Sequence, residues 1–194
     1  MAISRKISKS TSFWPSPFPD YFRLLAMSTL LVAAKEGDAS KCLTALASGA
    51  LSGLNARCEN GRTSLHYAAM HSLDKVCAVL LQRKDFSDLS VNAVDTFAGH
   101  TALHGAAVAA SSKCCRIIAT HCRFNKVSAR DAKGMTAEDL ALFFAERRGP
   151  TDGSVHAAAA RTIADARVAQ SARQTKTKSR DPSRYEVIPA SYLY

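Results

Sequence analysis

The chain has 194 residues, 47% of them hydrophobic, which suits about one globular domain with room for extensions. Its formal charge of +10 is spread as +3 in residues 1–27, +4 in 28–148 and +3 in 149–194. This distribution does not predict the clustered basic stripe of a nucleic-acid-binding protein, and no apolar run reaches the roughly 18 residues of a membrane span.

Residues 1–27 differ in composition from the rest and are predicted to form an extension. Residues 1–12 are basic, rich in Ser and Thr and free of acids, which is typical of an organelle transit peptide. Three prolines within 15–19 would interrupt the helix of such a peptide. Two other interpretations stay open: a disordered arm that lies on the first repeat, and an upstream stretch that the cell does not make because translation begins at Met27.

A nine-residue pattern recurs along the middle of the chain. It reads GRTSLHYAA at 61–69, GHTALHGAA at 99–107 and, in a degraded form, GMTAEDLAL at 134–142. The spacings of 38 and 35 residues indicate a stacked repeat array. In each copy the glycine permits the positive φ of a tight reversal and the threonine caps the helix that follows. The paired alanines let helices of successive repeats approach closely, and the leucine enters the core.

Each repeat is predicted to contain two helices. The expected helices are 30–36 and 39–47, 63–71 and 73–81, 101–110 and 113–121, and 136–147 and 155–173. Extra residues within 83–88 account for the longer of the two spacings. In repeat four, residues 148–153 are expected to break the chain, and Ser154 is expected to cap the last helix, whose inward face carries Val155, Ala159, Ile163 and Ala166. Residues 174–194 are predicted to be a basic, disordered tail.

The six cysteines follow no secreted framework and are interpreted as reduced thiols of an intracellular protein. Cys114, Cys115, His121 and Cys122 gather possible metal ligands, but zinc sites use spaced pairs. We expect core packing there instead, with Cys115 as the exposed thiol. The sequence holds no phosphate loop, carboxylate pair or nucleophile elbow, so we expect no enzyme activity, cofactor, metal or small-molecule substrate.

The Gly-x-Thr-x-Leu-His-x-Ala-Ala opening, in tandem, resembles the ankyrin repeat. The resemblance covers about 28–148 and extends toward 173. It implies an all-α solenoid of about four helix-turn-helix repeats with short β-like reversals, at about 28–55, 56–93, 94–128 and 129–173, within a domain of 28–173. The family's Thr-Pro-Leu-His has Ser64 or Ala102 in place of proline, and repeat four has lost the histidine, as terminal repeats often depart from the pattern.

The resemblance also implies roles for particular residues. His66 and His104 would tie neighbouring repeats together through hydrogen bonds. Partner proteins would bind the concave surface formed by reversal tips and first helices. The residues expected at that surface are Lys35, Glu36, Glu59, Asn60, Arg62, Met70, His71, Phe97, Ala98, His100, Val108, Ala109, Lys133, Met135, Phe143 and Phe144.

Phe97 is the leading contact among these, because an exposed aromatic side chain at a reversal tip has no core role. One of Phe143 and Phe144 is expected to pack under the last helix instead. The sequence thus predicts a monomeric, non-catalytic adaptor or scaffold that binds one or more proteins in the cytoplasm or nucleus. The alternative is an organelle-targeted or membrane-associated accessory protein addressed by residues 1–26.

Overall fold

The protein is described here by a computed structural model, which covers residues 29–48 and 53–178. The helices are α2 (Thr29–Glu36), α3 (Ala39–Ala47), α4 (Ser64–Met70), α5 (Asp74–Gln82), α6 (Asp88–Val91), α7 (Ala102–Val108), α8 (Ser112–Thr120) and α9 (Ala137–Lys178). Within these ranges no strand forms, and one isolated bridge joins Arg130 to Thr136. The all-α prediction is confirmed. The expected extension 1–27 and the tail beyond residue 178 lie outside the described residues.

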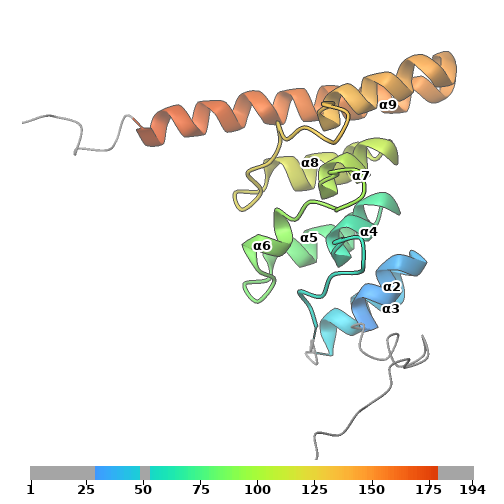
Figure 1. The fold of residues 1–194 in the computed structure, drawn as a ribbon, viewed down its shortest axis with the longest axis vertical. Helices are drawn as coiled ribbons and strands as arrows, with labels where there is room; N and C mark the ends of the chain where they lie inside the picture. Colours follow the sequence, from blue (N-terminus) through green and yellow to red (C-terminus); the bar gives the residue numbers. More distant parts are fainter. Residues whose placement is uncertain (1–28, 49–52, 179–194) are drawn as a thin grey trace, which may run out of the picture.

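The helix pairs stack on one another along the long axis of the molecule (Figure 1). The first helices pack in series, α2 on α4, α4 on α7 and α7 on α9, and the second helices do the same, α3 on α5, α5 on α8 and α8 on α9. Each pair therefore buries apolar surface against both neighbours, as a solenoid requires. Leu65 and Leu103 lie fully buried between the layers, as the repeat pattern predicts.

The reversals before each first helix use the glycines of the repeat pattern. Gly61, Gly99 and Gly134 have φ values of 71°, 70° and 77°. Only glycine adopts this left-handed region at little cost, so the predicted role of the three residues is confirmed.

The turn between the two helices of a pair also has a left-handed residue. Gly37 occupies it in repeat one with φ 77°, whereas Ser72 and Ala110 occupy it in repeats two and three with φ values of 58° and 54°. A side chain in this region costs about 1–2 kcal/mol, so repeats two and three hold these turns against local strain.

Repeat four departs from this plan: its first helix is long, as the sequence predicts, but the predicted break and cap after it need correction. The first helix does not turn at the equivalent position but continues to Gly149, whose φ of 78° and ψ of −178° separate α9 into two helical parts, 137–148 and 150–178. The two parts fold back on each other, since a β-carbon on Gly153 would collide with the backbone of Ala145. The break is thus one residue wide instead of 148–153, and Ser154 lies inside the second part instead of capping it.

The face of the second part is also rotated from the predicted one. Ala159, Ile163 and Ala166 are buried as expected, but Val155 is 50% exposed and His156 is buried in its place. The His156 ring lies 5.7 Å from that of Phe144, and its Nε2 atom lies 3.3 Å from the carbonyl oxygen of Val108. The helix continues to Lys178, so the first residues of the expected tail are helical.

The cysteine prediction was partly wrong. Cys115 is buried, and the exposed thiol of this group is Cys122. The reason is that α8 packs against α5 and α7 on one side and against α9 on the other, which covers more of its circumference than a single apolar face. Burial raises the pKa of Cys115 to about 12, so its thiol stays protonated.

Candidate functional site

An apolar row crosses the ends of the first helices. Met70, Val108 and Phe143 each lie seven residues after the threonine of their repeat. Their exposed fractions are 40%, 36% and 40%. Because α4 packs on α7 and α7 on α9, equivalent positions in these helices are neighbours. We call Met70, Val108 and Phe143 the apolar row. Large apolar residues at regular helix positions are usually buried. The repeated exposure of these three side chains therefore indicates an interaction surface.

The helices that carry the row are held in place by a threonine–histidine arrangement. The Thr63 amide donates to His66 Nδ1 at 3.2 Å. The proton of the neutral ring is therefore on Nε2, which donates to the carbonyl of His100 in the next repeat at 3.3 Å. His104 repeats this geometry with the Thr101 amide at 3.2 Å and the Met135 carbonyl at 3.3 Å.

These bonds confirm the predicted tie between repeats and also leave both rings without a free nitrogen. Burial lowers the pKa of His66 to about 4 and moves the pKa of His104 in the same direction. In repeat four Asp139 replaces the histidine and accepts from the amide and hydroxyl of Thr136 at 3.0 and 2.8 Å. A carboxylate caps the helix equally well but has no second nitrogen with which to reach another repeat.

At the reversal tips a basic side chain of one repeat lies beside a carboxylate of the next repeat. Arg62 lies 3.0 Å from Asp95, and His100 Nε2 lies 3.4 Å from Asp131. Both carboxylates also accept backbone amides of their own tips, from Ala98 to Asp95 at 2.8 Å and from Lys133 to Asp131 at 2.8 Å. Burial raises the pKa of each aspartate, but the backbone amides and the neighbouring basic side chain, Arg62 for Asp95 and His100 for Asp131, outweigh it and hold both pKa values below the ordinary range.

The tip of repeat three is longer than the others. A backbone bond closes each tip at 2.9 Å: Cys58 to Arg62, Asp95 to His100 and Asp131 to Met135. The middle tip thus holds one additional residue and displays Phe97, which is 82% exposed. We call residues 95–100 the long tip.

Comparison with known protein families agrees with this geometry. The description "Ankyrin repeat" matches residues 60–96, which run from the tip of repeat two to the tip of repeat three. Residues 60–96 are an ankyrin repeat, and the helix pairs on either side stack on it in series. A comparison with curated proteins finds no match.

A small pocket in the ankyrin array connects the tips to the apolar row. It lies between α4 and α7, measures about 260 Å³, and is lined by Arg62, His66, Met70, Asp95, His100, Thr101, Gly105, Val108 and Ala109. Gly105 makes this space: a β-carbon there would lie 2.9 Å from Met70 Cγ. The equivalent residue of repeat two is Tyr67, which is buried. The volume is below the roughly 300–1,000 Å³ of small-molecule sites, so the pocket suits one side chain better than a metabolite.

Five of the residues predicted at the binding surface therefore meet in one place, namely Arg62, Met70, His100, Val108 and Ala109. Other residues predicted at the binding surface make contacts that stabilise the fold. His71 covers Gly37, and its Nε2 lies 3.1 Å from the carbonyl oxygen of Lys35, while Glu36 pairs with Lys41 at 3.1 Å. The Met135 amide donates to the Asp131 carboxylate, and the Met135 carbonyl accepts from His104 Nε2.

The remaining predicted residues are distributed over the tips and α9. Glu59, Asn60 and Lys133 are exposed at their tips, and Ala98 is half-buried in the long tip. Phe144 is half-buried and contacts His156, so it is the one of the two phenylalanines that packs under the last helix.

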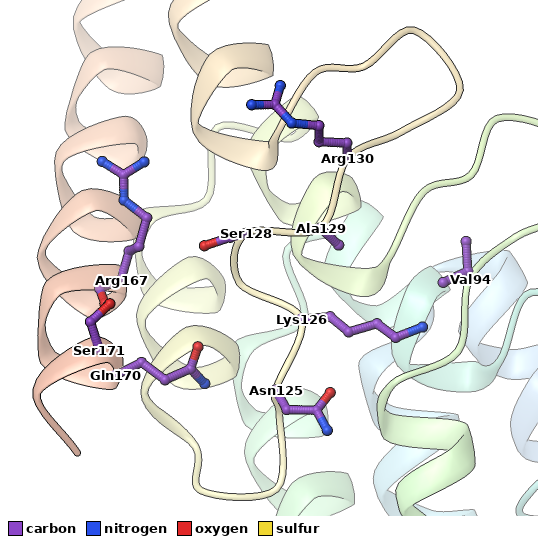
Figure 2. A pocket seen from close by; sticks show the side chains of 9 residues that line it. All are labelled: Val94, Asn125, Lys126, Ser128, Ala129, Arg130, Arg167, Gln170 and Ser171. Carbon is purple, nitrogen blue, oxygen red and sulfur yellow. The ribbon is translucent and has the colours of Figure 1, made fainter. Parts of the chain in front are cut away.

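A second cavity, of about 440 Å³, lies between the connection 125–130 and the second part of α9 (Figure 2). Most of its lining residues are polar, and Arg130 and Arg167 lie on opposite walls. Arg167 is paired with Glu138 at 3.2 Å, and Arg130 donates to the Gly134 carbonyl at 2.6 Å. In Figure 2 the Lys126 side chain points away from Arg167, toward Val94, so the cations do not converge on one ligand.

Sequence reasoning missed a second set of ties between repeats. Asn55 donates to the Asp85 carbonyl at 2.9 Å and accepts the Ser87 amide at 2.8 Å, on either side of the buried Phe86. Asn92 repeats this around Phe124, with the Arg123 carbonyl at 2.8 Å and the Asn125 amide at 2.9 Å. The signal was present, since both the asparagines and the phenylalanines recur at repeat spacing.

The part of the chain that the structure describes shows neither a metal site nor a membrane span. No group of three or more His, Cys, Asp or Glu side chains there is arranged to hold a metal ion. No helix in the same ranges is long and apolar enough to cross a membrane.

Proposed function

We propose that this ankyrin-repeat protein is a non-catalytic adaptor or scaffold that holds a partner protein on the apolar row and the long tip. The observation that carries the proposal is the repeated exposure of Met70, Val108 and Phe143 at equivalent positions. Exposed apolar side chains that line up across a domain mark interaction surfaces. Ankyrin repeats are protein-interaction modules in general, and the adaptor role and the particular face are our inference.

The long tip supports the same proposal. Phe97 is 82% exposed and lies in the long tip, where Asp95 accepts the amides of Ala98 and His100 and so holds the reversal rigid. A rigid aromatic side chain loses little conformational freedom on binding, and such residues often dominate interface energies.

The histidines do not favour catalysis. Both nitrogens of His66 and both of His104 are bonded within the array. A general base needs a free nitrogen within reach of substrate. His66 and His104 therefore serve to hold the repeats together.

The test compares two equally exposed apolar residues. Tagged wild-type protein, Phe97→Ala and Leu89→Ala are used to capture partners from cell extract, and the recovered peptides are quantified. Leu89 is the matched control, because it is 78% exposed but lies on α6, away from the tips. We expect Phe97→Ala to reduce recovery of specific partners at least about tenfold, the equivalent of about 1.4 kcal/mol, and Leu89→Ala to leave it unchanged. Equal recovery with both variants would contradict the proposal.

A further inference from the structure

Two arginines at the end of the apolar row have no acidic partner among the described residues. The guanidinium of Arg147 lies 5.1 Å from the centre of the Phe143 ring, and that of Arg148 lies 5.8 Å from the centre of the Phe144 ring. Both arginine side chains are exposed, and no carboxylate of the described residues pairs with either. A guanidinium that stacks on a ring keeps its N–H groups in a fixed plane, which suits bidentate binding of a carboxylate.

The position of these arginines is set by the unusual form of repeat four. The first part of α9 does not turn where α4 and α7 turn, and it reaches beyond their ends in Figure 1. Arg147 and Arg148 lie on this additional stretch, one turn after Phe143. The apolar row therefore ends at a pair of cations that the other repeats do not have.

The acids near the row and tips are already used within the fold. Asp95 is paired with Arg62, Asp131 with His100 and Glu36 with Lys41. Lys35 and Lys133, by contrast, are exposed and have no carboxylate partner among the described residues. Glu146 is exposed next to Arg147, but adjacent residues of a helix point about 100° apart. The surface around the row therefore presents more unpaired positive than negative charge.

We propose that the partner contributes an acidic amphipathic segment, with apolar side chains on Met70, Val108 and Phe143 and carboxylates on Arg147 and Arg148. This inference rests on the proposed function and adds the chemistry and direction of the ligand. The pocket beside Gly105 receives one apolar side chain of the segment. The acidic end lies at repeat four, because the cations are there.

The probe is a displayed library of random peptides, selected on the wild-type protein. We expect the selected peptides to combine apolar residues with a cluster of Asp or Glu at one end. Their binding should weaken at least about tenfold in Arg147→Glu/Arg148→Glu and less in Arg147→Gln/Arg148→Gln. The matched control, Arg116→Glu/Arg161→Glu, makes the same charge change at exposed positions of α8 and the second part of α9, and should have no such effect.

Two further measurements distinguish a failure of this inference from a failure of the proposed function. Binding of the selected peptides should weaken as salt rises from about 0.05 M to about 0.5 M, because exposed charges are screened. Peptides that depend on Phe97 or Val108, but lack acids and tolerate both arginine variants, would overturn this inference and leave the proposed function standing. A library that yields no peptide dependent on Phe97 or Val108 would overturn both.

Discussion

His66 Nε2 lies 3.3 Å from the carbonyl oxygen of His100, so the ring that caps one repeat also holds the next. Only the neutral ring makes this arrangement, because Nδ1 must accept the Thr63 amide while Nε2 donates. His104 does the same one repeat later. The two histidines therefore couple the stability of the array to pH.

The first prediction concerns this coupling. The folded protein lowers the pKa of His66 from 6.5 to about 4, so between these values the unfolded chain binds more protons. The stability that His66 contributes is complete above about pH 6.5 and is lost as pH falls toward 4. The loss is on the order of 3 kcal/mol by the relation of 1.36 kcal/mol per unit. Urea unfolding at several pH values measures it.

The variant His66→Gln isolates the effect of this one ring. It should be less stable than wild type at pH 7 and should lose less stability between pH 6.5 and 4. The pKa values of Asp95 and Asp131 are lowered in the folded protein. Protonation of these two carboxylates therefore affects stability mainly at lower pH. A His66→Gln protein with the full wild-type pH dependence would contradict the prediction.

The second prediction concerns Gly105 and Met70. Alanine in a helix interior is normally favoured over glycine by about 0.5–1 kcal/mol. At Gly105, however, the new β-carbon would lie 2.9 Å from Met70 Cγ, and Met70 must move. In the wild-type background we expect Gly105→Ala to leave the free energy of unfolding almost unchanged or to lower it. In a Met70→Ala background the same substitution should raise the free energy of unfolding by the whole of about 0.5–1 kcal/mol. A double-mutant cycle by urea unfolding should give a coupling of about 1 kcal/mol, and strict additivity would show that the two residues do not compete for space.

The third prediction concerns the asparagine tie. Asn92→Ala leaves the Arg123 carbonyl and the Asn125 amide without their side-chain partner. We expect a loss of about 1–3 kcal/mol in the free energy of unfolding. The control is Asn60→Ala at an exposed tip, where only the backbone carbonyl is used, by the Thr96 amide at 2.9 Å. Equal effects of the two substitutions would argue against a role for the Asn92 amide.

The fourth prediction concerns Arg123, which holds the additional residues of repeat two. Its guanidinium donates to the carbonyls of Leu81, Arg83 and Phe86 and pairs with Asp88. Arg123→Gln removes most of these bonds and should cost about 2 kcal/mol. Arg116→Gln, an exposed change on α8, is the control in the same urea measurement and should cost less than about 0.5 kcal/mol.

The sequence by itself determined the array, because its signals are local and recur with the repeat. A glycine that needs positive φ, a threonine that caps and a histidine three residues later act through neighbours a few residues away, so their pattern can be read directly. The period then places successive copies side by side. The same pattern predicts Phe97 as an exposed tip residue, and its side chain is 82% exposed.

Tertiary packing alone decided the form of repeat four and the ties between distant residues. The rotation of the second part of α9, which buries His156 and exposes Val155, is set by contacts with both α7 and α8. The bonds of Asn92 and Arg123 join residues about one repeat apart, and no local pattern states which backbone group each side chain will meet. The sequence predicted the first helix of repeat four as far as Arg147, but the helical placement of Arg148 and the one-residue break at Gly149 depend on how the two parts of α9 pack together.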